Sequence, residues 1–210
     1  MFFSKHVQSS SPATLDVPLF PLHTVLFPGG VLPLRVFEAR YMDMTRDCLR
    51  NNTPFGVCLI REGREVGAPA VPEPIGCLAR IAACDMQQMG VLNIRTHGQQ
   101  RFRALEHATG PQGLLRARIE LIEAEPEIAV PADLQACVKL LQVIAADQAK
   151  DVIVEPYRFD DAAWVGYRLA EIMPVPLVAK QKLMELEDSI SRLQILHQFL
   201  SQRGLLQNQA

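Results

Sequence analysis

The stretch VPLFPLHTVLFPGGVLPLRVFEARY, residues 17–41, decides how this chain folds. It is rich in Val, Leu and Phe, yet it holds four prolines and two glycines. Proline lacks the backbone N–H that a helix interior or a central strand requires, which argues against both structures here. Because so apolar a segment would form a large adhesive patch on the surface, it has to be buried. We therefore expect short edge strands joined by a turn.

The first half of the stretch predicts an edge strand followed by a turn. Residues 17–22 can form a strand at a sheet edge, where Pro18 and Pro21 are tolerated. The FPGG sequence at residues 27–30 is typical of a turn, because Pro28 fixes the backbone at the first corner. The glycine that follows can take a positive φ at the second corner.

The second half predicts a strand and then a helix. Residues 31–37 alternate in polarity, which places Arg35 on the face opposite three apolar side chains. Residues 38–50 carry apolar side chains at helical spacing, and Pro54 lies beyond the end of this helix. The inner positions of the helix are predicted to be Tyr41, Met44, Cys48 and Leu49.

Further strands are predicted up to residue 122. Their apolar and alternating patterns cover residues 55–60, 75–84, 91–97, 100–107 and 114–122. Together with the two strands above, this makes about seven strands and one helix, which favours a small barrel or a bent antiparallel sheet. Residues 61–74 form a loop that is long for a compact barrel, and such loops are often functional.

The composition changes at the acidic, proline-containing stretch EAEPEIAVP, residues 123–131, and the rest reads as helix. Four amphipathic helices are predicted, at residues 131–150, 162–172, 176–187 and from a cap at 188 or 189 to Gly204. The fold class is therefore α+β. We expect a flexible tail at residues 1–14, a barrel at 15–124, a linker at 125–130 and a helical bundle at 131–205.

Charge and hydropathy exclude several classes of function. The formal net charge of -2 gives no global attraction to nucleic acid or to anionic membranes. No apolar run approaches the roughly 18 residues of a membrane span, so no membrane partner is expected. The first 14 residues lack the long apolar stretch of a secretory signal.

The cysteines and histidines indicate no metal site and no disulfides. Five cysteines occur without a C-x-x-C pair, which is typical of reduced thiols in a cytoplasmic protein. The histidines are scattered without the spacing of metal ligands. We expect four of the thiols to be buried, namely Cys48, Cys58, Cys77 and Cys84.

An ordered series of motifs resembles the N-terminal, substrate-recognition domain of Lon protease, the ATP-dependent protease La. The series begins with PLFPL, LFPGG, LPL and FEARY inside the opening stretch. It continues with FGVCLI, IGCLARI, RFRALE and AKQKLMELEDSISRLQIL, so that the similarity spans about residues 15–203. The resemblance implies a PUA-like β-barrel of about six to seven strands with one helix, followed by a bundle of about four helices.

The family signature is expected to be structural. Its residues here are Pro18, Phe20, Pro21, Phe27, Pro28, Gly29, Pro33, Phe37, Glu38, Arg40 and Tyr41. The prolines would mark a strand at the barrel rim and prevent it from pairing with another chain. At the strand-to-helix corner we expect hydrogen bonds from Arg35, Glu38, Arg40 or Tyr41, so that removing the Glu38 carboxylate would lower the melting temperature.

The resemblance implies a module that binds unfolded or partner polypeptides without chemistry of its own. The sequence has no G-x-x-x-x-G-K-[ST] loop for ATP phosphates, and its Ser–Lys neighbours, Ser4 and Lys5, lie in the predicted tail. No enzyme activity, cofactor or metal is therefore expected. We expect an apolar groove between barrel and bundle, with contacts from Met86 and Met89 in the turn DMQQMG and from Val66 and Val71 in the long loop.

An arginine-rich barrel face suggests an alternative, an RNA-binding PUA-like module. The arginines lie in neighbouring predicted strands, at positions Arg95, Arg101, Arg103, Arg116 and Arg118. They favour either a solvated outer face with cross-strand ion pairs or a stripe that binds RNA. No aromatic side chains interleave with them on that face, so bases would lack a stacking platform. A third possibility, an unrecognised hydrolase, has no paired nucleophile and base to support it.

Overall fold

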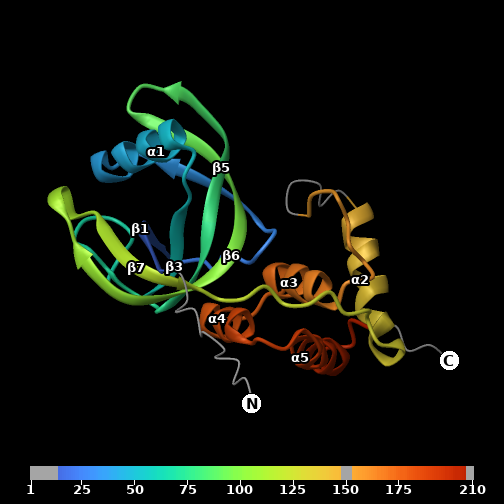
Figure 1. Ribbon diagram of the computed structural model, residues 1–210. Coiled ribbons are helices and arrows are strands. Elements are labelled where there is room, and N and C mark those ends of the chain that lie inside the picture. The colour runs from blue at the N-terminus through green and yellow to red at the C-terminus, as the bar shows by residue number, and fades with distance from the viewer. Residues whose placement is uncertain (1–13, 148–152, 207–210) are drawn as a thin grey trace, which may run out of the picture.

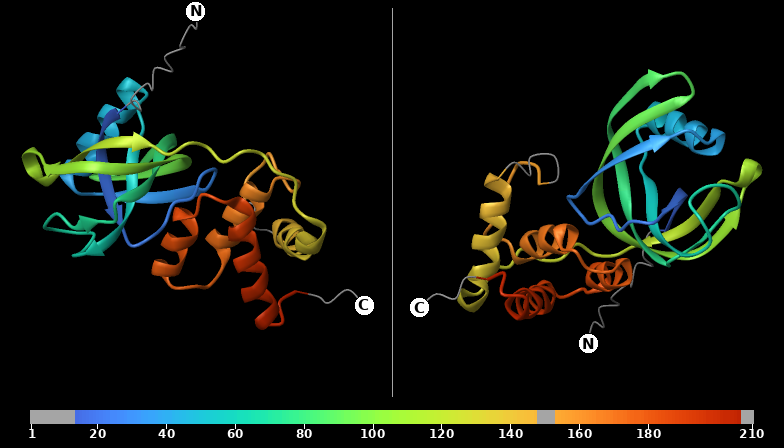
Figure 2. Two further views of the ribbon diagram at one scale, coloured as in Figure 1. Left: turned by 60° about the horizontal axis from the view of Figure 1, so that its bottom comes forward. Right: turned by 180° about the vertical axis from the view of Figure 1, so that it is seen from behind.

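The computed structural model describes residues 14–147 and 153–206. A strand-rich, barrel-like part is followed by helices, and the two parts lie side by side (Figures 1 and 2). The predicted α+β class is confirmed.

The barrel is a seven-stranded sheet that closes on itself. Its order is β1-β7-β6-β5-β3-β4, and a further pairing of β1 with β3 completes the ring, while β2 pairs with β6. The strands are β1 (Thr14–Leu22), β2 (Val31–Val36), β3 (Phe55–Glu62), β4 (Val71–Pro72), β5 (Ile75–Gln88), β6 (Val91–Thr109) and β7 (Leu115–Leu121).

The edge-strand prediction for residues 17–22 is wrong, because β1 closes the barrel. Its first part pairs antiparallel with β7, and its second part pairs in parallel with β3. The change of partner occurs at Leu19, the one residue in both registers. Each half of β1 is therefore paired along only one of its two edges. Pro18 and Pro21 lack a backbone N–H, and they are tolerated because the unpaired edge requires no N–H donor.

The strand β6 is longer than predicted. The two strands expected at residues 91–97 and 100–107 form one strand, and β5 runs on to Gln88. Gly98 lies inside β6 rather than at a break, because it is bonded to the turn between β1 and β2. Its N–H donates to the Gly30 carbonyl at 2.8 Å, and its own carbonyl accepts from the Gly29 N–H at 2.8 Å. Gly29 has the positive φ, 72°, that the turn predicts.

The helix α1 (Ala39–Asn51) packs against β2 and the facing strands. The Tyr41 ring stacks on Phe20 with centroids 3.9 Å apart. The Arg40 guanidinium is 2.9 Å from the Glu38 carboxylate and donates to the Gly113 carbonyl at 3.1 Å. Leu49 is 45% exposed, so its predicted inner position is wrong, and one of the buried positions is Thr45 instead.

The helical part is built on α3 (Ala162–Ile172), whose bounds match the prediction. The expected helix at 131–150 divides into the 3-10 turn η2 (Ala132–Leu134) and α2 (Gln135–Ala146), and residues 148–150 lie outside the described residues. The last two helices are α4 (Leu177–Glu185) and α5 (Ser189–Gln202). Asp161 caps α3 by accepting from the Ala163 N–H, and Asp188 caps α5 by accepting from the Ser191 N–H.

Three of the four cysteines predicted to be buried are buried, but Cys84 is exposed on the projecting part of β5. Burial raises the pKa of the Cys77 thiol to about 12. These buried thiols therefore act as small apolar side chains of the core.

Candidate functional site

An open apolar groove lies between α4 and α5. It encloses about 560 Å³, within the range of roughly 300–1,000 Å³ that is usual for ligand pockets. Its walls are Val175, Ala179, Lys182, Leu183, Glu185, Leu186, Ile195, Leu196 and Phe199.

The groove exists because α4 and α5 both pack on α3. On α5, Leu193, Leu196 and Leu200 face the core, whereas Ile195 and Phe199 form a neighbouring stripe at i, i+4 spacing. Ile195 is 49% exposed. The apolar face of α5 is thus wider than the part of it that packs against the core. The remaining apolar surface forms one wall of the groove.

Charged groups stand at the groove's rim and not on its floor. The Lys182 ammonium is 2.7 Å from the Glu185 carboxylate on the same helix. The Arg203 guanidinium lies 4.9 Å from the centroid of the Phe199 ring. The interior offers apolar contact, and the rim offers two positive groups and one negative group.

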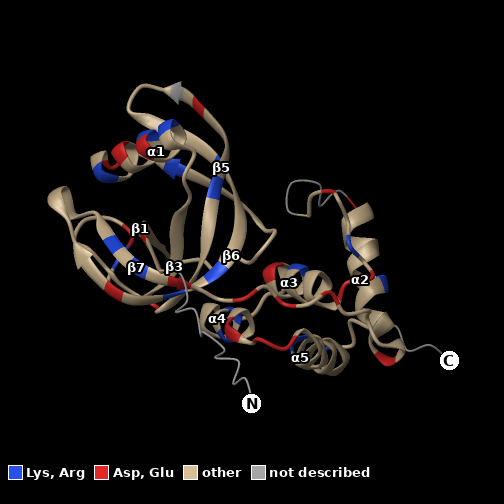
Figure 3. Ribbon diagram, in the orientation of Figure 1, with Lys and Arg blue, Asp and Glu red and all other residues tan. Residues whose placement is uncertain are grey.

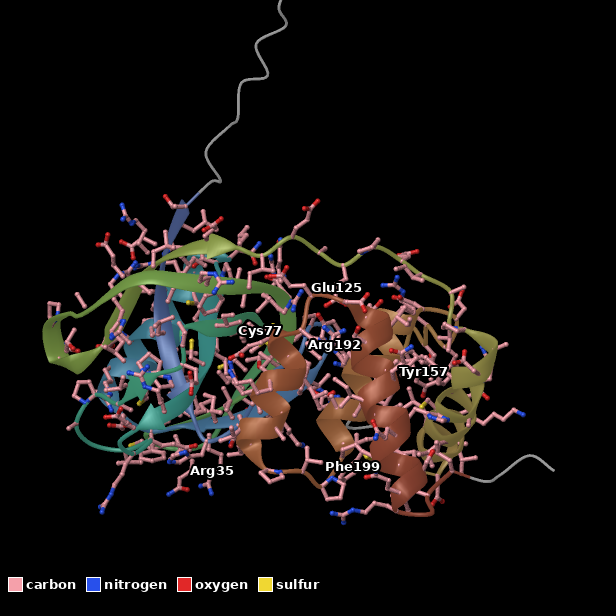
Figure 4. The ribbon with its side chains drawn as sticks, turned by 90° about the horizontal axis from the view of Figure 1, so that it is seen from below. Arg35, Cys77, Glu125, Tyr157, Arg192 and Phe199 are labelled. Carbon is pink, nitrogen blue, oxygen red and sulfur yellow. The ribbon has the colours of Figure 1, made fainter. Side chains whose placement is uncertain are left out.

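A buried ionic cluster fixes the helical part against the barrel (Figure 4). Arg101 on β6 donates to the carbonyls of Met184 and Leu186, at 2.8 and 2.7 Å. These carbonyls lie at the C-terminal end of α4, where a cation is favoured. Between the barrel and the helices, Glu125 lies 3.1 Å from Arg101 and accepts from Arg192 at 2.8 Å.

The predicted arginine stripe on the barrel does not exist as such. Arg101 is buried, 3% exposed, so its predicted place on a solvated outer face is wrong. Arg116 pairs with Asp16 at 3.5 Å, Arg118 pairs with Glu106, and Arg103 lies opposite Glu120 in the sheet. The cross-strand ion pairs considered above are therefore present at Arg116 and Arg118, and they favour a solvated outer face at these two positions.

The contact between barrel and helices combines apolar packing with charged groups: Phe27 and Ile75 belong to the same buried cluster as the core of the helical part, and the Phe27 and Tyr167 ring centroids are 5.9 Å apart. A pocket of about 390 Å³ opens there, and its lining includes Arg101, Glu125, Arg158 and Asp161. We expected an apolar groove at this place; the apolar groove lies within the helical part instead. Arg101 and Glu125 line the pocket that remains open there, beside the apolar contact of the two parts.

A family model for the substrate-binding domain of ATP-dependent protease La (Lon) matches residues 16–202 of this chain. The chain belongs to the Lon substrate-binding domain family. The resemblance seen in the sequence motifs is thereby confirmed.

Solved and curated relatives agree with this assignment. The crystal structure of a Lon N-terminal domain protein from Xanthomonas campestris is 34% identical with a TM-score of 0.74, covering 88% of this chain and 98% of that one. Lon protease 2 of Herpetosiphon aurantiacus is 27% identical over 203 residues, which is 92% of this chain but 24% of the relative. Protein cereblon of Gallus gallus is 28% identical over 124 residues, 57% of this chain and 26% of cereblon. The chain spans about a quarter of the length of these curated relatives.

Most residues of the Lon signature lie in the barrel core or at its turns. Phe20, Phe27, Arg40 and Tyr41 are buried, as is Pro21. Pro18, Pro28 and Glu38 are half-buried, and Gly29, Pro33 and Phe37 are exposed.

The structure does not bring the four predicted contact residues together. Met86 and Met89 lie at the β5–β6 hairpin, 55% and 93% exposed, whereas Val66 lies in the β3–β4 loop and Val71 in β4. The hairpin and the loop are well separated in Figures 1 and 2. None of the four lines the α4–α5 groove.

The sequence analysis missed the groove residues. The signal in the sequence that could have indicated the groove was Ile195 and Phe199. These two apolar side chains lie beside the inner stripe of α5 and are not needed to complete it.

Two further features, a metal-binding group of side chains and a membrane-spanning helix, are absent from the described residues. Within residues 14–147 and 153–206, no three His, Cys, Asp or Glu side chains are grouped in a way that could bind a metal ion. None of the helices in those ranges has the length and apolar character needed to cross a membrane.

Proposed function

We propose that this Lon-type domain recognises unfolded or partner polypeptides by taking up their exposed apolar side chains in the α4–α5 groove. The observation that carries the proposal is the groove itself, an open surface with apolar walls in a domain of a substrate-binding family. Its floor presents no polar pattern, so it would select for apolar character and not for a particular sequence.

The expected affinity is modest. Burying one large apolar side chain contributes about 1.5–3 kcal/mol. Association and ordering of an unfolded chain cost several kcal/mol, which leaves a Kd of about micromolar or weaker. Several copies acting together would strengthen binding through avidity.

We further propose that recognition proceeds without catalysis. The 210 residues contain no G-x-x-x-x-G-K-[ST] loop, and the sequence shows no paired nucleophile and base. Incubation with ATP or with labelled casein should give no turnover. The free cysteines further support a reducing, cytoplasmic location.

The test is a single substitution at the groove wall. Ile195→Asp puts a charge into the apolar surface, and the exposed position should tolerate it. We expect binding of a fluorescein-labelled, reduced and alkylated polypeptide, measured by anisotropy, to weaken about 10-fold, which corresponds to about 1.4 kcal/mol.

The matched control is Val143→Asp on α2. Val143 is 65% exposed, and it does not line the groove. This variant should bind the polypeptide as the wild type does. Equal binding by the two variants, or no binding of the polypeptide by the wild type at the highest soluble concentration of the domain, would refute the proposal.

A further inference from the structure

One face of the outer sheet formed by β2, β5 and the first half of β6 is covered by α1, and the other is open. Leu34 pairs with Ile94, and both belong to the cluster that packs with α1. Side chains alternate between the two faces of a strand, so the neighbours of these residues point away from α1. These neighbours include Arg35 on β2 and Arg95 on β6.

The open face gathers positive charge from three strands. Arg95 lies opposite Pro33, Arg35 lies opposite Asn93, and Arg80 on β5 lies opposite His97. Arg35 and Arg80 are exposed, and Arg95 is half-buried. Figure 3 shows basic positions on β2 and on β5, the two strands that flank β6 in the sheet.

These arginines differ from the others on the barrel in lacking acidic partners. Among residues 14–147 and 153–206, none of Arg35, Arg80 and Arg95 forms an ion pair; Arg80 is hydrogen-bonded to the Asn52 side chain. An acidic residue on this face, Asp85, lies opposite Asn93. The face therefore carries a net positive charge that the domain does not neutralise.

The three arginines form a diagonal row across β2, β6 and β5, with one arginine on each strand. Neighbouring strands are about 4.8 Å apart and alternate residues of one strand about 6.8 Å apart, so successive arginines of the row are about 8 Å apart. Long arginine side chains at this separation can reach carboxylates that repeat about every 6.8 Å along one side of an extended peptide. Phe37, two residues beyond Arg35 and 54% exposed, adds an apolar contact at the end of the row.

We propose that this face is a second recognition surface, which binds extended polypeptide segments that carry alternating acidic side chains and an apolar residue. The proposal rests on the proposed function of polypeptide recognition, and it names an acidic class of target. Charge complementarity commits the surface to an anionic partner. A polypeptide fits better than a nucleic acid, because a single exposed aromatic side chain gives no row of stacking platforms.

The experiment uses a labelled 12-residue peptide with alternating glutamates and one phenylalanine, and a second peptide with glutamine in place of glutamate. The full 210-residue chain should bind the acidic peptide more tightly, and added salt should weaken that binding. The double variant Arg35→Glu/Arg95→Glu should bind it about 10-fold more weakly. The control Arg116→Glu/Arg118→Glu changes the net charge equally at two exposed arginines already in ion pairs, and it should bind nearly as the wild type does.

The outcomes separate this surface from the α4–α5 groove. Ile195→Asp should keep its affinity for the acidic peptide, and Arg35→Glu/Arg95→Glu should keep its affinity for an unfolded polypeptide without acidic segments. If charge reversal disturbs folding, as a melting curve would show, Arg35→Gln/Arg95→Gln replaces it. Equal binding of the two peptides, equal effects of the two double variants, or tighter binding of a single-stranded oligonucleotide at Arg35 and Arg95 would each overturn the proposal.

Discussion

At the residue scale, Glu171 on α3 lies buried beside the turn that follows β1. Its side chain is 14% exposed, with one carboxylate oxygen 3.2 Å from the Arg168 Nε and the other against Gly30. Arg168 also donates to the Pro28 carbonyl at 2.9 Å. Burial raises the pKa of the Glu171 carboxyl to about 7, although the nearby cations Arg168 and Lys180 act to lower it.

This carboxyl should make stability depend on pH. The folded pKa of about 7 lies above the ordinary value of 4.5, so the folded state holds the proton more tightly than the unfolded state does. The free energy of unfolding contributed by Glu171 therefore falls as the pH rises from about 4.5 to about 7. Glu171→Gln removes this titration, and its stability relative to the wild type should rise by about 2 kcal/mol between pH 5 and pH 8.

Urea unfolding at a series of pH values measures the effect. Glu127→Gln is the control, because it makes the same substitution at a side chain that is 80% exposed. A stability difference between Glu171→Gln and the wild type that stays constant with pH would contradict the assignment.

At the element scale, the turn at residues 27–30 joins the barrel to the helices. Its backbone bonds to Gly98 in the middle of β6, and the Pro28 carbonyl accepts from α3. A Cβ at Gly98 would overlap the Phe27 carbonyl oxygen, which is backbone and cannot rotate away. Gly98 is therefore required for close approach and not for a strand break.

Gly98→Ala should be strongly destabilising. Separating β6 from the turn would break the two hydrogen bonds at Gly98, and we expect a loss of about 2–4 kcal/mol in the free energy of unfolding. Thermal and urea unfolding give the measurement. Gly90→Asn is the comparison, because Gly90 has open space around it and Asn tolerates its positive φ. Similar stabilities for the two variants would show that the contact at Gly98 is unimportant.

The elements also show which features sequence alone can predict. Helix α3 was predictable to the residue because its amphipathic pattern, its cap at Asp161 and the following proline all agree. The position of β1 in the barrel could not be predicted, because prolines in a strand sequence indicate an edge strand whether or not the folded strand is paired on both sides. Arg101 looked like a surface residue because its partner Glu125 lies 24 positions further along and meets it only in the folded chain.

At the scale of the whole molecule, a shared apolar cluster and buried polar contacts together set how the barrel meets the helices. Besides Arg101, Glu125 and Arg192, the Gln181 amide on α4 donates to the Ile75 carbonyl on β5 at 3.0 Å. These contacts fix the separation of α4 from α5, and the groove is the space between the two helices. The groove could not be predicted from the sequence, because it depends on how α4 and α5 pack against α3.

The central claim is that polypeptides bind in the α4–α5 groove. The most direct measurement is a backbone-amide NMR titration of the domain with an unfolded, alkylated polypeptide. We predict that shift changes concentrate at residues 175–186 and 195–199 and that Ile195→Asp abolishes them. Shift changes confined to the barrel, or an unperturbed spectrum at saturating polypeptide, would contradict the claim.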